Sequence, residues 1–253
     1  MVTVKDISDF INKTAPYETK CDWDNCGLLV GSYAQECRKI GFVLDLTYET
    51  LSEAEKCGCD LIVTHHPVIF RPKKSFLSGD VVFEAASKGI SVISAHTCFD
   101  CADGGVNDVL ADILGLAEVK GVPSSECSVP MARIGVINKT SSENFASYVA
   151  KKLATTVRFV DAENEIERVA VCGGSGMSFL DDVISMGADA YVTGDISHHE
   201  MLEAKEKGIT VIAAGHFETE SPSMYALKNY VSEEFSEVET VVLLQNNPVK
   251  FIS

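Results

Sequence analysis

The sequence repeats one long phrase, and this duplication constrains the fold more than any other feature. The segment KGISVISAH (88–96) returns as KGITVIAAGH (207–216), offset by one inserted glycine. Upstream of each copy lies a second matching pair, EKCGCDLIVTHH (55–66) and ISMGADAYVTGD (184–195). In both halves a helical pattern ends at Gly-x-Asp, a strand ends in Val-Thr, and a later strand ends at a histidine. Self-similarity of this length predicts an internal duplication of one α/β unit.

Apolar runs typical of strands alternate along the chain with segments of helical periodicity. Val4, Ile7 and Ile11 mark an opening helix, and Ser142 is placed to cap a helix in the second half. The alternation predicts an α/β fold with largely parallel sheets, in which ligands gather beyond the carboxyl ends of the strands. Further helices are expected at 48–57, 80–88, 105–115, 178–186, 197–207 and 222–233, and strands at 26–31, 39–46, 60–64, 90–95, 131–137, 156–160, 167–172, 189–193, 209–213 and 239–244.

A segment rich in proline and serine, 119–130, divides the chain into halves of similar length and is expected to be a linker. We therefore expect a first repeat at 1–125 and a second at 126–253. No apolar run approaches the ~20 residues that a membrane span needs. The opening residues lack the basic and apolar regions of a signal peptide, so we expect a cytoplasmic protein with no membrane partner.

Charge and cysteine content restrict the partners and the compartment. The formal net charge of −16 makes a nucleic-acid partner unlikely, because such affinity rests on Lys and Arg neutralising phosphates. A small anionic ligand could still bind at a locally positive site such as a metal cluster. The nine cysteines are odd in number and lack the spacing of a disulfide framework, which favours a reducing compartment.

Two adjacent histidines end a predicted strand immediately before a proline. In DLIVTHHPVIF (60–70), Pro67 favours an extended His66, so the side chains of His65 and His66 are expected to diverge. A diverging pair serves two metal ions more easily than one. A histidine after a strand is more often a buried or capping residue, so this phrase gains weight only from the phrases that accompany it.

Two further phrases place a carboxylate four residues after a histidine. Asp100 follows His96 and Glu220 follows His216, and Ser221-Pro222 is expected to open a helix that leaves Glu220 on a loop. Such donors, shared between two ions with one carboxylate bridging, leave open positions typical of a reactive or exchangeable site for zinc, iron or manganese. The predicted ligands are His65, His66, Asp100, His216 and Glu220.

A glycine-rich turn, CGGSGMSF (172–179), separates a predicted strand from a predicted helix. Backbone N–H groups of Gly173, Gly174 and Gly176 could bind an anion. The phrase has neither the Walker pattern nor the spacing of the dinucleotide fingerprint. We favour a tight turn, with substrate anchoring as the second interpretation.

Several polar and aromatic residues near these phrases allow two interpretations. Asp45, which ends a strand, and the pair His198-His199 could orient metal ligands, or could be surface or capping residues. Trp23 and Asn25 are expected to fix a turn rather than to touch substrate.

Six phrases resemble the NIF-three-like proteins, known as type 2 homologues of GTP cyclohydrolase 1 or as dinuclear metal centre hexameric proteins. The resemblance runs from about residue 4 to the C-terminus. It implies two intertwined, duplicated α/β repeats with mixed, mostly parallel sheets, and a toroidal homohexamer with a two-metal site facing its cavity. The phrases are WDNCGLLVG (23–31), DLIVTHHPVIF (60–70), AHTCFD (95–100), CGGSG (172–176), DAYVTGD (189–195) and AGHFETE (214–220).

Carried over by position, the resemblance implies the same five ligands on two divalent ions, with Glu220 bridging and His96 lining the site as a proton carrier. The insertion domain of some relatives has no room between residues 120 and 135. Two function classes follow. The first is a metal-dependent hydrolase acting on a nucleotide or phosphorylated small molecule, for example GTP with ring opening and formate release. The alternative is a metal or iron chaperone, or a hexameric binding scaffold, without turnover.

One phrase departs from the family pattern. The usual His-Thr-Asn-Leu-Asp is here His96-Thr97-Cys98-Phe99-Asp100, followed by Cys101. The resulting C-x-x-C around a predicted ligand indicates either a softer metal preference with redox sensitivity, or two small buried thiols. We favour buried thiols, because a four-thiolate zinc site needs a second pair and Cys57-Gly-Cys59 has the wrong spacing.

Overall fold

The computed structural model describes residues 1–124 and 127–250, which form two compact units. The first unit contains residues 1–103 and 224–248, and the second contains residues 104–223 and the described end of the chain, 249–250. The chain thus passes from one unit to the other after Asp103 and returns at Met224. No helix in these described ranges combines the length and apolar character that crossing a bilayer requires.

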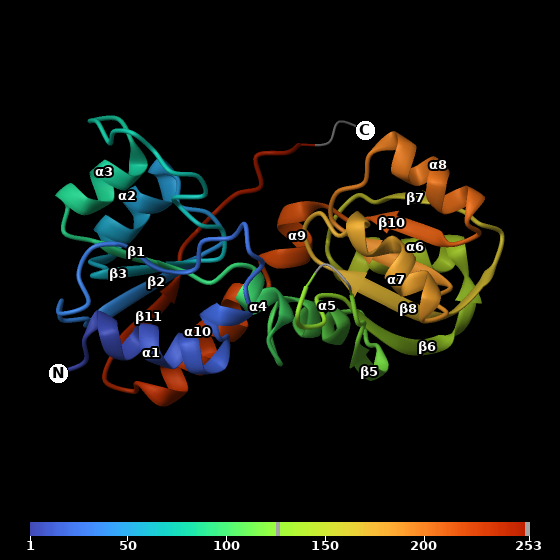
Figure 1. Ribbon diagram of the computed structural model, residues 1–253, viewed down its shortest axis with the longest axis horizontal. Coiled ribbons are helices and arrows are strands. Elements are labelled where there is room, and N and C mark those ends of the chain that lie inside the picture. Colours follow the sequence, from blue (N-terminus) through green and yellow to red (C-terminus); the bar gives the residue numbers. More distant parts are fainter. Residues whose placement is uncertain (125–126, 251–253) are drawn as a thin grey trace. The chain divides into compact units, whose positions relative to one another are not determined.

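The first unit is a sheet with helices on both faces (Figure 1). Its strand order is β1-β4-β3-β2-β11, in which β2, β3, β4 and β11 run parallel and β1 is antiparallel to β4. The strands are β1 (Gly27–Val30), β2 (Lys39–Val43), β3 (Leu61–Thr64), β4 (Ser91–Ser94) and β11 (Glu239–Val242). Helices α1 (Val4–Thr14) and α10 (Ser223–Glu234) cover one face, and α2 (Tyr48–Cys57) and α3 (Val81–Ser87) the other.

Burial on both faces explains the apolar strands of this unit. All four residues of β3 are buried, as a central parallel strand requires. Leu51 of α2 and Val82 of α3 pack with Val43, Ile62 and Val92 in one core cluster. The carboxyl ends of β2, β3 and β4 therefore meet at one edge, where Val43 pairs with Thr64 and Thr64 with Ser94.

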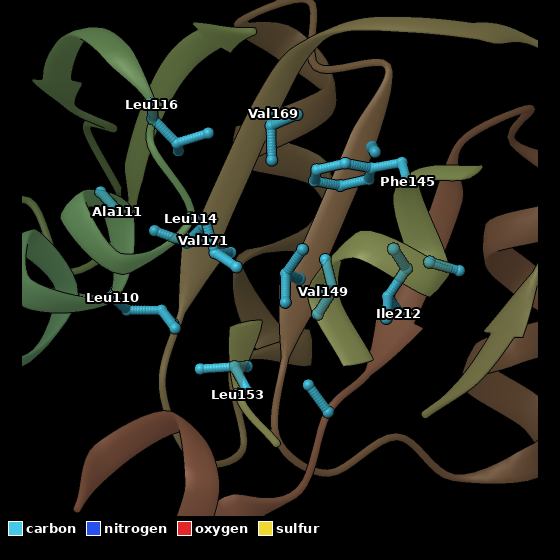
Figure 2. Close-up of a cluster of buried hydrophobic side chains, with 14 of the residues drawn as sticks. Leu110, Ala111, Leu114, Leu116, Phe145, Val149, Leu153, Val169, Val171 and Ile212 are labelled. Carbon is cyan, nitrogen blue, oxygen red and sulfur yellow. The ribbon is translucent and has the colours of Figure 1, made fainter. Parts of the chain in front are cut away.

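The second unit is a mixed sheet of order β5-β6-β8-β9-β10-β7 with a parallel centre, β8-β9-β10. Its strands are β5 (Ala117–Gly121), β6 (Arg133–Ser141), β7 (Arg158–Val160), β8 (Glu165–Cys172), β9 (Ala190–Thr193) and β10 (Thr210–Ala213). Its helices include α5 (Val106–Ile113), α6 (Ser142–Lys152), α7 (Leu180–Ser185), α8 (His198–Glu206) and α9 (His216–Glu220). Figure 2 shows Leu110, Phe145 and Val149 from α5 and α6 packed on Val171 and Ile212 of the sheet.

The topology confirms the internal duplication. Strands β1-β4-β3-β2 of the first sheet and β7-β10-β9-β8 of the second have the same order and directions. A long helix precedes each set, α1 in the first repeat and α6 in the second. A five-residue helix, a second helix and a strand follow each set: α4, α5 and β5 in the first repeat, and α9, α10 and β11 in the second. In the first repeat these last elements, α5 and β5, belong to the second unit, whereas α10 and β11 of the second repeat belong to the first. The two repeats are therefore intertwined.

Most predicted elements are present, and three local expectations were wrong. Residues 119–121 of the expected linker belong to β5, and the expected repeat boundary at 125/126 lies outside the described residues and stays a prediction. The cap of α6 is Ser141, whose side chain accepts from Asn144 N–H at 3.3 Å, because Ser142 is already helical. Glu220 is not on a loop but ends helix α9.

The two His-x-x-x-acid phrases fold into short helices that the sequence analysis missed. Helix α4 (Thr97–Cys101) follows β4, and α9 follows β10. Each has five residues, which is too short to show a 3.6-residue apolar period. Both nevertheless place the first and fifth residues of a His-x-x-x-acid phrase on one side of a turn.

Candidate metal centre

His65 directly follows β3, and its ring is fully buried. Nδ1 lies 2.9 Å from the carbonyl oxygen of Ala95, the residue after β4. A ring nitrogen that faces a carbonyl must carry the hydrogen, so the neutral ring has its lone pair on Nε2. Nε2 lies 3.5 Å from Oδ1 of Asp100. His65 therefore has the tautomer and fixed orientation of a metal-binding histidine.

His66 is oriented by a carboxylate from the neighbouring strand. Its Nδ1 lies 2.7 Å from Oδ1 of Asp45, two residues beyond the end of β2. Asp45 therefore orients His66, and metal binding by His66 stays a prediction. Gln245, beyond β11, makes two hydrogen bonds with Asp45. Its Nε2 donates to Asp45 Oδ2 at 2.6 Å, and its Oε1 accepts the Asp45 backbone N–H at 3.0 Å.

His96 precedes helix α4 and is held by Asp24, a residue to which the sequence analysis gave no role. Its Nδ1 lies 2.9 Å from Asp24 Oδ1, and Asp24 Oδ2 accepts the N–H and hydroxyl of Thr97 at 3.0 and 2.5 Å. Burial alone raises the pKa of Asp24, but the hydrogen bonds and charge of His96 and the bonds from Thr97 outweigh it. The pKa of Asp24 lies well below its usual range.

The three rings form a compact group, which we call the histidine cluster (His65, His66 and His96). Ring centroids lie 5.0 Å apart for His65–His66 and for His65–His96, and 5.4 Å apart for His66–His96. One possible ligand atom from each lies within 4.8 Å of the others. The Nδ1 atoms of His65 and His66 face different acceptors, the Ala95 carbonyl oxygen and Asp45, and the divergence of the two side chains toward two ions stays a prediction. The cluster is a group that could hold a metal ion.

His216 and Glu220 form a second set of donors at the two ends of helix α9. His216 Nδ1 lies 2.7 Å from Asp195 Oδ2, and Nε2 lies 3.1 Å from Glu220 Oε2. Asp195 thus holds the ring from the side opposite Glu220, while Glu220 itself is buried. The arrangement repeats the pattern of His65, in which an acceptor fixes Nδ1 and Nε2 lies beside a carboxylate.

Glycines leave room for the His216–Glu220 pair. At Gly174, where φ is +62°, a Cβ would lie 2.2 Å from Glu220 Oε1 and 3.2 Å from His216 Nε2. At Gly194 a Cβ would lie 2.6 Å from the carbonyl oxygen of Gly174. The loops after β8 and β9 therefore close tightly around α9, and any side chain at Gly174 would displace the carboxylate.

Comparison with known proteins identifies the family. The Duf34/NIF3 (NGG1p interacting factor 3) family model matches residues 2–248. This chain belongs to the NIF3 family. It is 33% identical to the GTP cyclohydrolase 1 type 2 homolog of Clostridium perfringens, over 98% of this chain and 99% of that protein. It is 34% identical to the protein of the same name from Clostridium acetobutylicum, over 98% of each.

Solved structures agree with the family fold. Staphylococcus aureus hypothetical protein SA1388 superimposes with a TM-score of 0.90 at 27% identity, covering 99% of each chain. Reduced HcgD from Methanocaldococcus jannaschii gives 0.83 at 30% identity, covering 96% of this chain and 98% of that one. The duplicated α/β architecture is therefore that of the NIF3 family.

The C-x-x-C departure from the NIF3 pattern consists of two unbridged thiols. Cys98 is buried, and its hydrogen bond with Cys26, with burial second, raises the pKa of its thiol far above the usual value. Cys101 is half-buried, and its Sγ lies 3.4 Å from the Cys98 carbonyl oxygen and from Thr19 Oγ1. The interpretation as buried thiols holds for Cys98 and only in part for Cys101. All nine cysteines, which lie in the described ranges, are unbridged.

The remaining predicted residues take framework or surface positions. N–H groups of the glycine-rich turn donate to side chains: Gly173 to Asn107 at 2.7 Å and Gly176 to Thr193 at 2.9 Å. Gly174 N–H likewise donates to Thr219 Oγ1 at 3.1 Å. This is the tight turn that we favoured, and anchoring of a substrate by these three glycines stays a prediction. The pair at 198–199 is exposed at the start of α8, as the surface interpretation expected.

Proposed function

We propose that this chain binds two divalent metal ions and uses them to hydrolyse a nucleotide or a phosphorylated small molecule. The observation that carries the proposal is the histidine cluster, in which all three Nδ1 atoms face fixed acceptors. Membership in a family whose curated members bear the name GTP cyclohydrolase 1 type 2 homolog supports a nucleotide substrate.

The residues that would hold the ions lie beyond the carboxyl ends of parallel strands, after β3, β4 and β10. Imidazole and carboxylate donors fit zinc, iron or manganese. The proposed ligands are His65, His66, Asp100, His216 and Glu220.

Bound divalent ions would lower the pKa of water and stabilise developing negative charge. The chain's own residues orient the ligands and move the proton. Asp24 accepts the Nδ1–H of His96, so Nε2 is the atom of His96 that takes up or releases a proton. The ionised Asp24 stabilises the resulting imidazolium. We therefore propose His96 as the proton carrier.

Elemental analysis combined with turnover tests this function. After metal loading, the full chain should hold about two equivalents, and His65→Ala and Glu220→Ala should hold less. His199→Ala, a change at an exposed histidine, is the matched control. GTP and a panel of phosphorylated nucleotides should be turned over by wild type and not by Asp100→Ala. Metal content near zero would refute the proposal.

The alternative class predicts a different result in the same experiment. A metal chaperone or binding scaffold would hold the ions, release one rapidly to a chelator, and show no turnover above that of Asp100→Ala. Family resemblance also leads us to propose a homohexamer in the cytoplasm. Light scattering after size exclusion should then give six times the chain mass, and a monomer mass at micromolar concentration would contradict it.

A further inference from the structure

Two large aromatic side chains stand exposed beside the histidine cluster. Trp23 is 59% exposed and Phe70 is 46% exposed. Their ring centroids lie 5.6 Å apart, and each also contacts His96, at 5.8 Å from Trp23 and 6.4 Å from Phe70. We call Trp23 and Phe70 the aromatic platform. Together they extend the wall of the cluster outwards from His96.

The platform is held in place by polar contacts on both sides. Asp24, next to Trp23, is buried and accepts from His96 and Thr97. Asn25 Nδ2 donates to the carbonyl oxygen of Ile69, the neighbour of Phe70, at 2.7 Å. The two loops are thus tied to each other and to the cluster. A fixed, exposed apolar surface next to polar groups is typical of a binding site.

Positive charge follows the platform along the chain. Arg71, Lys73 and Lys74 come directly after Phe70 and are exposed, in a chain of net charge −16. Lys73 pairs with Asp80 at 2.7 Å. Within the described residues Arg71 and Lys74 form no ion pair. An anionic group of a ligand on the platform would find these cations within reach.

We propose that the platform binds the planar heteroaromatic ring of a nucleotide-class ligand, whose anionic group is contacted by Arg71. This proposal rests on the proposed function and names its substrate class. The planes of Trp23 and Phe70 differ by 51°, so a ring stacked on Trp23 would lie tilted against Phe70 rather than face to face with it. Because every base offers a π-face, the platform selects for an aromatic ring rather than for one base.

Trp23 is the only tryptophan of the chain, so its fluorescence reports on the platform directly. We would titrate metal-loaded full-length protein with GTP, guanosine and inorganic tripolyphosphate. GTP and guanosine should quench the emission, and tripolyphosphate should not. In calorimetry, Trp23→Leu should weaken GTP binding about fivefold or more, whereas Trp23→Phe should retain most of the affinity.

The charge contact is tested separately. Arg71→Gln should weaken GTP binding about threefold, as expected for an exposed charge pair, and should leave guanosine binding unchanged. Tyr33→Leu, an exposed aromatic of the same unit, and Arg38→Gln, an exposed arginine, are the matched controls and should bind GTP like wild type. Equal loss in Arg71→Gln for both ligands would refute the anionic contact.

The outcomes separate this proposal from the proposed function. Trp23→Leu should keep the metal content of wild type. If metal content is normal and Trp23→Leu binds GTP as tightly as wild type, the platform proposal is wrong and the metal centre stands. If wild type holds no metal, the proposed function fails first. If Trp23→Leu instead lowers the oligomeric mass, the platform is a contact between copies of the chain, and the ligand proposal is overturned.

Discussion

The loops at the carboxyl ends of the strands differ sharply between the two repeats, although the strands correspond one to one. Strand register aligns Thr64 with Thr193, so His65 and His66 of the first repeat correspond to Gly194 and Asp195 of the second. The first repeat thus offers imidazoles where the second offers a close backbone approach and an orienting carboxylate.

The same exchange occurs after the first strand of each parallel set. Asp45, which orients His66, corresponds to Gly174, which makes room for Glu220. Each repeat therefore keeps one carboxylate beyond a parallel strand that fixes a histidine, Asp45 after β2 in the first and Asp195 after β9 in the second, whereas Asp24, which holds His96, precedes β1. The duplication gave the two repeats equivalent loop positions, and a few of these positions then changed residue type. As a result, the first repeat carries the three imidazoles of the histidine cluster, and the second carries the His216–Glu220 pair.

The largest effect is expected on stability, from substitution of Gly174 in the second repeat. Gly174→Ala should lower the free energy of unfolding by about 3 kcal/mol, from left-handed backbone strain plus collision with Glu220. Gly208→Ala is the control, because Gly208 has φ +74° and open space around it, so only about 1 kcal/mol should be lost. Urea denaturation of metal-free protein measures both. Equal losses would show that the tight closure around α9 is not required.

The orienting carboxylates should matter equally in both repeats. Asp45→Asn and Asp195→Asn should each weaken metal binding about 10- to 100-fold, because each leaves a histidine without its charged acceptor. Competition with a chromogenic chelator measures the change. Asp181→Asn, at an exposed carboxylate paired with Lys207, is the control and should have no effect. If only one of the two variants lost metal affinity, Asp45 and Asp195 would not have equivalent roles in the two repeats.

A smaller effect is expected from Gln245, because it acts on His66 only through Asp45. Gln245→Leu should weaken metal binding about threefold, the value of one part-buried polar contact. Asp195 of the second repeat has a Ser175 hydroxyl at 3.2 Å instead. The double variant Asp45→Asn/Gln245→Leu should bind metal as tightly as Asp45→Asn alone. If the two losses of metal affinity instead add, Gln245 acts by another route than Asp45.

The least effect at neutral pH is expected from the titration of Asp24. Its pKa is lowered in the folded state, so its contribution to stability is fully present above the unfolded pKa of about 4 and is lost as pH falls towards the folded value. Stability of metal-free wild type should therefore fall more steeply below about pH 4 than that of Asp24→Asn, whose contribution does not titrate. Denaturation series at several pH values measure the two slopes, and parallel slopes would contradict the assignment.

Much of the fold was predictable because its signals are local. The duplicated phrases, the apolar strands and the helices between them appear within short windows of sequence, and β3, α2 and β4 lie where the patterns placed them. The short helices α4 and α9 were missed, because five residues carry no periodic signal. The cap of α6 was assigned one residue too late, because Ser141 and Ser142 are indistinguishable as caps without backbone angles.

The sequence by itself determined the repeated α/β unit and the positions of the candidate ligands, since strand ends and histidine phrases are consecutive residues. Only the tertiary structure decided what holds those ligands. Asp24 reaches His96 across 72 residues and Gln245 reaches Asp45 across 200, and no local pattern marks either pair. The reciprocal exchange of α5 and β5 for α10 and β11 was likewise set by packing. Contacts between distant segments depend on the folded topology, which places different strand ends at one edge of a sheet.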